Sequence, residues 1–142
     1  MNRKLSLDDA IDFIEAEVST VWAKLQAIYS CGDKPKITFE SKKSKVAGFA
    51  FYDTSKGVKF NLAYFCSHES KKDLAETIAH ELCHIVQFRI FPAEKQAHGP
   101  AFKFIMNSLG YSGNTYHYMN VKAAKNTVDS IGEDIKVTAN DF

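Results

Sequence analysis

The sequence contains no long hydrophobic run. Its apolar runs extend over only a few residues, far short of the roughly 20 that are needed to cross a bilayer. The polar start MNRKLSLDD also lacks the apolar stretch of a signal peptide. We therefore expect a protein that is neither secreted nor inserted in a membrane, with a cytoplasmic or nucleoid-associated location.

Cysteine is scarce as well. Cys31, Cys66 and Cys83 are too few and too irregularly spaced for a disulfide framework. No CxxC pair is present, so a cysteine-based structural zinc site is not expected. We predict three reduced thiols.

The composition is that of a folding chain. A length of 142 residues with 45% hydrophobic content allows one domain to bury a core. The aromatic share of 13% suits a packed interior and not a disordered or fibrous chain. We predict a monomer with a single domain over residues 1–142, in which residues 122–142 form a loosely ordered tail.

The net charge of +1 is unevenly distributed. Residues 33–72 hold nine lysines against four acidic residues, a local charge of +5, and the rest of the chain carries −4. The Lys-rich region 34–72 can therefore contact a phosphate backbone, such as that of single-stranded or damaged DNA. A solvated surface with no such partner is the plainer interpretation.

Apolar periodicity predicts three helices. The spacing of Ser6 and Asp9 is that of a capping box, and apolar residues then recur every three or four positions, which predicts a helix over about 7–30. A second helix is expected from Ser70 to about Arg89. A third starts at Gly99-Pro100 and runs to about residue 109.

Between the first two helices the pattern changes to alternation, which is typical of strands. Apolar residues alternate around positions 37–39, 49–51 and 58–62. The turn-rich segment 53–57 joins the last two of these strands, so we expect them to form an antiparallel hairpin. The pattern of the last twenty residues predicts neither a helix nor a strand.

The second helix carries the residues with the clearest chemistry. Residues 80–84 read His-Glu-Leu-Cys-His, an HExxH motif. On a helix the spacing of His80 and His84 places both imidazoles on one face, where they can bind one tetrahedral Zn²⁺. Glu81 lies beside them and can act as the base that takes a proton from water acidified by the metal. The plainer interpretation is a pair of ordinary histidines.

A catalytic zinc ion needs a third protein ligand and an open fourth position. Glu94, His98 and His117 are the candidates, and position 90, where some HExxH enzymes have their third histidine, is Ile. We favour His98, because Gly99 and Pro100 start a helix there and can direct the imidazole back toward the motif. The alternative for His98 is a residue that only caps the helix.

Taken together, these residues resemble the SprT-like family, metallopeptidases that include the Spartan proteases of DNA–protein crosslink repair. The resemblance rests on HELCH at 80–84 and HGPAFKFIM at 98–106. Weaker support comes from the strand at 58–65, which contains Asn61, and from the aromatic segment 115–118, so that the likeness covers about residues 5–121.

The resemblance implies an α+β fold of the minimal zincin-like type. An N-terminal helix, a small three-stranded antiparallel sheet, the HExxH helix and a following helix would make up this metalloprotease domain. It also implies one catalytic zinc ion and endopeptidase activity of low sequence specificity against DNA-bound proteins, stimulated by DNA. The chain has no zinc ribbon, so the lysines would have to provide DNA contact, helped by Trp22 or Tyr52 stacking on unpaired bases.

Other roles remain expectations at this point. Tyr116, His117 and Tyr118 are candidates, by position alone, for stabilising the oxyanion or contacting substrate. The edge of the sheet is a plausible place for an extended substrate to add as a strand. The alternatives to a peptidase are a noncatalytic zinc-containing DNA-binding or regulatory protein and a hydrolase of nonpeptide bonds, such as a nuclease.

Overall fold

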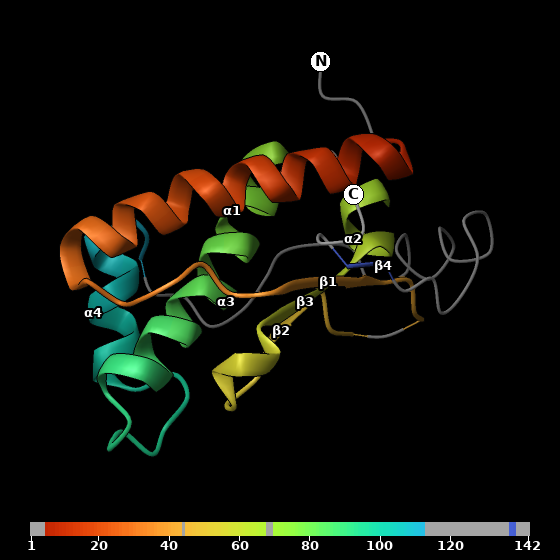
Figure 1. Ribbon diagram of the computed structural model, residues 1–142. Coiled ribbons are helices and arrows are strands. Elements are labelled where there is room, and N and C mark those ends of the chain that lie inside the picture. The colour runs from red at the N-terminus through yellow and green to blue at the C-terminus, as the bar shows by residue number, and fades with distance from the viewer. Residues whose placement is uncertain (1–4, 44, 68–69, 113–136, 139–142) are drawn as a thin grey trace.

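The computed structural model describes residues 5–43, 45–67, 70–112 and 137–138, and Figure 1 shows the arrangement of its helices and strands. The elements in chain order are α1 (Leu7–Tyr29), β1 (Ile37–Glu40), β2 (Gly48–Ala50), the short 3₁₀ helix η1 (Thr54–Lys56), β3 (Val58–Asn61), α2 (Leu62–Ser67), α3 (Lys71–Ile90), α4 (Pro100–Ser108) and β4 (Val137–Thr138). The predicted α+β class is confirmed. No helix within the described ranges is both long and apolar enough to span a membrane.

Helix α1 begins and ends close to where the sequence predicts. The Ser6 hydroxyl accepts a hydrogen bond from the Asp9 backbone N–H at 3.2 Å, which caps the first turn. The chain leaves the helix at Ser30 in a left-handed conformation with φ 48°, and the Ser30 N–H donates to the Gln26 carbonyl. Figure 1 shows α1 extending along one side of the domain, with its C-terminal end near α4.

The sheet has the strand order β2-β3-β1-β4. Strands β2 and β3 are antiparallel, which confirms the predicted hairpin, and β4 pairs antiparallel with β1. However, β1 runs parallel to β3, so the prediction of a purely antiparallel sheet of three strands is wrong. After β1 the chain crosses to the far edge of the sheet to form β2, and β3 then lies between these two strands. Alternation of apolar and polar residues predicts a strand, but it does not predict which strand will lie beside it.

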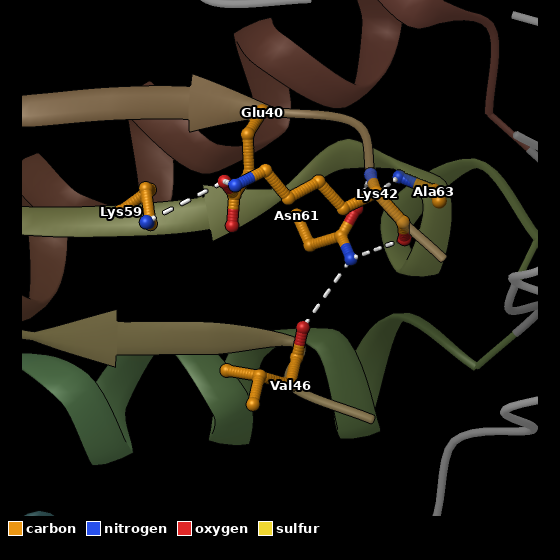
Figure 2. Close-up of polar contacts among 6 residues, drawn as sticks. All are labelled: Glu40, Lys42, Val46, Lys59, Asn61 and Ala63. Carbon is orange, nitrogen blue, oxygen red and sulfur yellow. Dashed lines mark hydrogen bonds and ion pairs between the residues drawn. The ribbon is translucent and has the colours of Figure 1, made fainter. Parts of the chain in front are cut away.

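The buried side chain of Asn61 holds this connection in place (Figure 2). Its Oδ1 accepts hydrogen bonds from the backbone N–H groups of Lys42 and Ala63, both at 3.2 Å. Its Nδ2 donates to the carbonyls of Lys42 at 2.9 Å and Val46 at 3.3 Å. Asn61 therefore fixes both ends of the loop that crosses from β1 to β2. It also caps α2, the helix that begins at Leu62, where the sequence predicted the end of a strand.

Helix α3 is the central element, packed between α1 on one side and β2, β3 and α4 on others. The Ser70 side chain accepts from the Asp73 N–H at 3.3 Å and caps its start, as predicted. The sequence predicted one apolar stripe, but residues 81–87 are all buried, whatever their polarity. Three polar side chains are thereby drawn into the interior at intervals of three residues: Glu81, His84 and Gln87.

Arg89 links the C-terminal end of α3 to the loop that follows α1 and to the short helix η1. It donates to the carbonyls of Cys31 at 3.1 Å and Asp33 at 2.7 Å, and to the hydroxyl of Thr54 at 3.3 Å. Its guanidinium also lies over the ring of Trp22, 5.5 Å from the centroid. Trp22 is buried in the core and has no ring face open to a nucleic-acid base.

The three cysteines are free and buried, as expected for reduced thiols. Burial raises the pKa of the Cys66 thiol to about 11, which disfavours its reactive thiolate form. These thiols are therefore part of the packed interior.

Candidate metal centre

Two elements bring three histidines together. His80 and His84 lie one turn apart on α3, and His98 projects from the loop that precedes α4. Their Nε2 atoms form a nearly equilateral triangle, with sides of 3.2 Å between His80 and His84, 3.1 Å between His84 and His98, and 3.2 Å between His98 and His80. His98, which is 14 residues distant from His84 in the sequence, is thus placed beside the HExxH pair.

This triangle fits one metal ion. Zinc–nitrogen bonds of about 2.0–2.1 Å in a tetrahedral site place the nitrogen ligands about 3.3 Å apart. The observed separations are within 0.2 Å of that value. Hydrogen bonding alone does not explain three mutually close ring nitrogens, because each neutral imidazole has only one N–H to donate. The three histidines could therefore hold a metal ion through their Nε2 atoms.

Phe102 of α4 forms an apolar support for the cluster. Its buried ring is nearly parallel to that of His84, with the centroids 4.2 Å apart and an interplanar angle of 19°. It also meets His80 at 4.8 Å and His98 at 5.1 Å, both at steep angles. A single side chain thus restrains all three imidazoles from one helix.

Burial favours the neutral form of two of the three histidines, His84 and His98. Burial lowers the pKa of His84 to about 4, against a smaller opposing effect of its hydrogen bond with Gln87. Burial also lowers the pKa of His98. Neutral imidazole is the form that binds a metal, so these shifts favour ligation at neutral pH.

Glu81 lies between α3 and β2 and is 8% exposed. Its side chain lies against the backbone of Gly48, where an added Cβ would come within 2.9 Å of the Glu81 Cγ and 3.3 Å of Oε2. Among the described residues, nothing donates a hydrogen bond to this carboxylate, and burial raises its pKa to about 8. A bound cation would oppose that rise, because it favours the charged form.

The other candidates for a third ligand are placed differently. Glu94 turns toward α4, where its carboxylate accepts from the N–H groups of Ala101 at 2.8 Å and Phe102 at 3.4 Å. It is therefore engaged as a helix cap and is not among the clustered ligands. His117 lies outside the described residues, as do Tyr116 and Tyr118.

Comparison with family models gives one match, to the SprT-like family over residues 18–125. The chain belongs to the SprT-like family. The likeness seen in the two histidine motifs is thereby confirmed, and the SprT-like match extends from within α1 past the end of α4. Comparisons with curated proteins and with solved structures gave no match.

Two residues of this SprT-like centre were missed by sequence reasoning. Gln87 contacts His84, and its spacing of three residues from that histidine within an otherwise apolar segment was a usable signal. Gly48 lies against Glu81, but nothing local identified it, because the two residues meet only through packing of β2 on α3.

Proposed function

We propose that this SprT-like domain is a zinc-dependent endopeptidase. The observation that carries the proposal is the convergence of three Nε2 atoms, two of them from the same helix as Glu81, a buried residue whose carboxylate has no hydrogen-bond donor among the described residues. A structural zinc site has no use for such a carboxylate, whereas hydrolysis requires a proton acceptor next to the metal.

In this mechanism His80, His84 and His98 would hold the zinc ion. When bound, zinc supplies the acidification of a water molecule and the polarisation of the substrate carbonyl. The Glu81 carboxylate accepts the proton of the attacking water and later delivers it to the leaving amine. The Glu81 side chain is largely buried against Gly48 of β2, which limits competition from bulk water for that proton.

The proposed substrate lies along β2. This strand ends the sheet on the side away from β4 and passes next to Glu81 through Gly48. An extended polypeptide that paired with the outer edge of β2, which pairs with no other strand of the described residues, would be recognised by its backbone, which accounts for low sequence specificity. The scissile bond would then approach the metal centre from this edge.

We further propose that the natural substrates are proteins associated with or crosslinked to DNA, and that DNA stimulates cleavage. Two features support this. Lysines concentrate in residues 34–72, the part of the chain that contains β2. Tyr52, just beyond β2, is 69% exposed and can stack on an unpaired base.

The deciding experiment compares Glu81→Gln with the wild type. We expect casein and histone cleavage to fall by at least a hundredfold while the bound zinc remains at one equivalent. Glu76→Gln, at the other glutamate of α3, is the matched control and should cleave normally. Unchanged cleavage in Glu81→Gln would reject the base role.

Each assay is run with and without single-stranded DNA. Stimulation by DNA supports the proposed substrate class, and DNA binding without any cleavage would favour the noncatalytic alternative. The ligand set is tested by zinc content, which should fall sharply in His98→Ala and stay normal in the control variant Glu76→Gln. Normal zinc content in His98→Ala would redirect the third-ligand assignment to His117.

A further inference from the structure

Gln87 is the last of the polar residues buried along α3, and it is 1% exposed. Its Oε1 lies 3.0 Å from Nδ1 of His84. Its Nε2 donates to Oε1 of Glu94 at 2.6 Å and to the carbonyl of Gln96 at 3.0 Å. The amide oxygen thus contacts His84, a proposed metal ligand, and the amide nitrogen contacts the loop that leads to His98.

These contacts decide the orientation of the Gln87 amide. A flipped amide would place its oxygen against the Glu94 carboxylate and the Gln96 carbonyl, which are acceptors only. The NH₂ group must therefore face that loop, and the oxygen must face His84. Because an amide oxygen can only accept, Nδ1 of His84 carries the proton, and its Nε2 presents a lone pair toward the other two histidines.

Glu94 extends the same arrangement to the third histidine. It accepts from the N–H groups of Ala101 and Phe102 at the start of α4, where the helix dipole favours a negative charge. Gly99 packs against it so closely that a Cβ there would lie 2.8 Å from the Glu94 Cδ. His98 is the residue before Gly99, so one carboxylate fixes both the backbone next to His98 and the amide next to His84.

We propose that Gln87 and Glu94 are positioning residues that set the metal centre before any metal binds. Gln87 fixes the Nδ1–H tautomer and the ring plane of His84, and Glu94 ties Gln87 to the loop of His98. This inference rests on the proposed metal site but not on the proposed peptidase activity. Outer partners of this kind typically contribute 10–100-fold to metal affinity.

The first test is the tautomer of His84 in metal-free protein, measured from its ¹⁵N chemical shifts. We expect the Nδ1–H form in the wild type and a mixture containing the Nε2–H form in Gln87→Met. Methionine keeps the length and volume of glutamine but offers only a weak acceptor. Gln26→Met, at an exposed glutamine of α1, is the matched control and should keep the Nδ1–H form.

The second test is zinc affinity, measured by competition with a chromophoric chelator. Gln87→Met should bind zinc 10–100-fold more weakly. Glu94→Gln should lose less, about 3–10-fold, because the new amide keeps one acceptor oxygen but not two. If Glu94 acts through Gln87, the fold loss of zinc affinity in the double variant should be smaller than the product of the fold losses in the two single variants. Circular dichroism verifies that each variant is folded.

These outcomes separate the inference from the proposed function. A wild-type His84 in the Nε2–H form, or unchanged zinc affinity in folded Gln87→Met, would overturn the role of Gln87. Strictly additive losses would overturn the coupling through Glu94. A protein with the expected tautomer and tight zinc binding that cleaves no polypeptide would instead refute the peptidase proposal and leave this inference standing.

Discussion

Asn61 and Glu81 are both polar and buried, at 1% and 8% exposure, yet their surroundings are opposite. Asn61 makes four hydrogen bonds, as many as its amide can be expected to form. Glu81 receives none from the described residues. Because buried polar groups are almost always paired, the four hydrogen bonds of Asn61 indicate a structural role. The carboxylate of Glu81, which has no partner among the described residues, is compatible with the catalytic role that we propose for it.

The largest stability effect is expected from the satisfied residue. Asn61→Ala removes four hydrogen bonds and should lower the free energy of unfolding by about 3 kcal/mol. Urea denaturation measures this loss, with Asn107→Ala on the exposed face of α4 as the control. A loss no larger than that of the control would mean that Asn61 does not hold the 41–47 connection.

Glu81→Gln should raise the free energy of unfolding of the metal-free protein, whereas Asn61→Ala lowers it. Burial raises the pKa of Glu81 in the folded state from its ordinary value of 4.5 to about 8, so burial of its charge destabilises the wild type increasingly as the pH rises between these values. The variant should therefore be more stable by about 2 kcal/mol at pH 8, and the advantage should disappear near pH 4.5. Thermal unfolding in a chelator at both pH values tests this, and a less stable variant at pH 8 would break the comparison.

Gly48→Ala tests whether the placement of Glu81 matters as much as its charge. The added methyl group would meet the Glu81 Cγ at 2.9 Å and must displace the side chain. We expect a roughly tenfold loss of cleavage, about 1.4 kcal/mol in activation free energy. Zinc content and the thermal midpoint act as internal controls, and loss of zinc would show instead that the whole site had moved.

Glu40 is an intermediate case and should give the smallest effect. It is buried, and its Oε2 forms ion pairs of 3.4 Å with Lys42 and Lys59 but accepts no hydrogen bond (Figure 2). Both lysines are partly exposed to solvent, so Glu40→Gln should cost only about 1 kcal/mol. The cost should shrink in 0.5 M salt, and a salt-independent value would argue against the ion pairs as its source.

Much of this fold could be predicted from local pattern. Caps at Ser6 and Ser70 and apolar periodicity located α1 and α3 to within a residue or two. The β2–β3 hairpin followed from alternation around a turn. The parallel pairing of β1 with β3 could not be predicted, because local pattern does not show that the chain crosses β3 after β1. The contacts of Asn61 with that crossing loop join residues 15–19 positions apart in the chain.

The sequence by itself determined the chemistry of the candidate site: two histidines one helical turn apart, a glutamate between them, and a third histidine at the start of α4. Helix geometry is local, so the spacing of His80 and His84 was enough to place them on one face. Only the tertiary structure decided that His98 completes the triangle while Glu94 does not, and that Gln87 and Gly48 lie against His84 and Glu81. Those contacts arise from packing α3 against α4 and β2, and packing joins residues whose distance in the sequence carries no information about their distance in space.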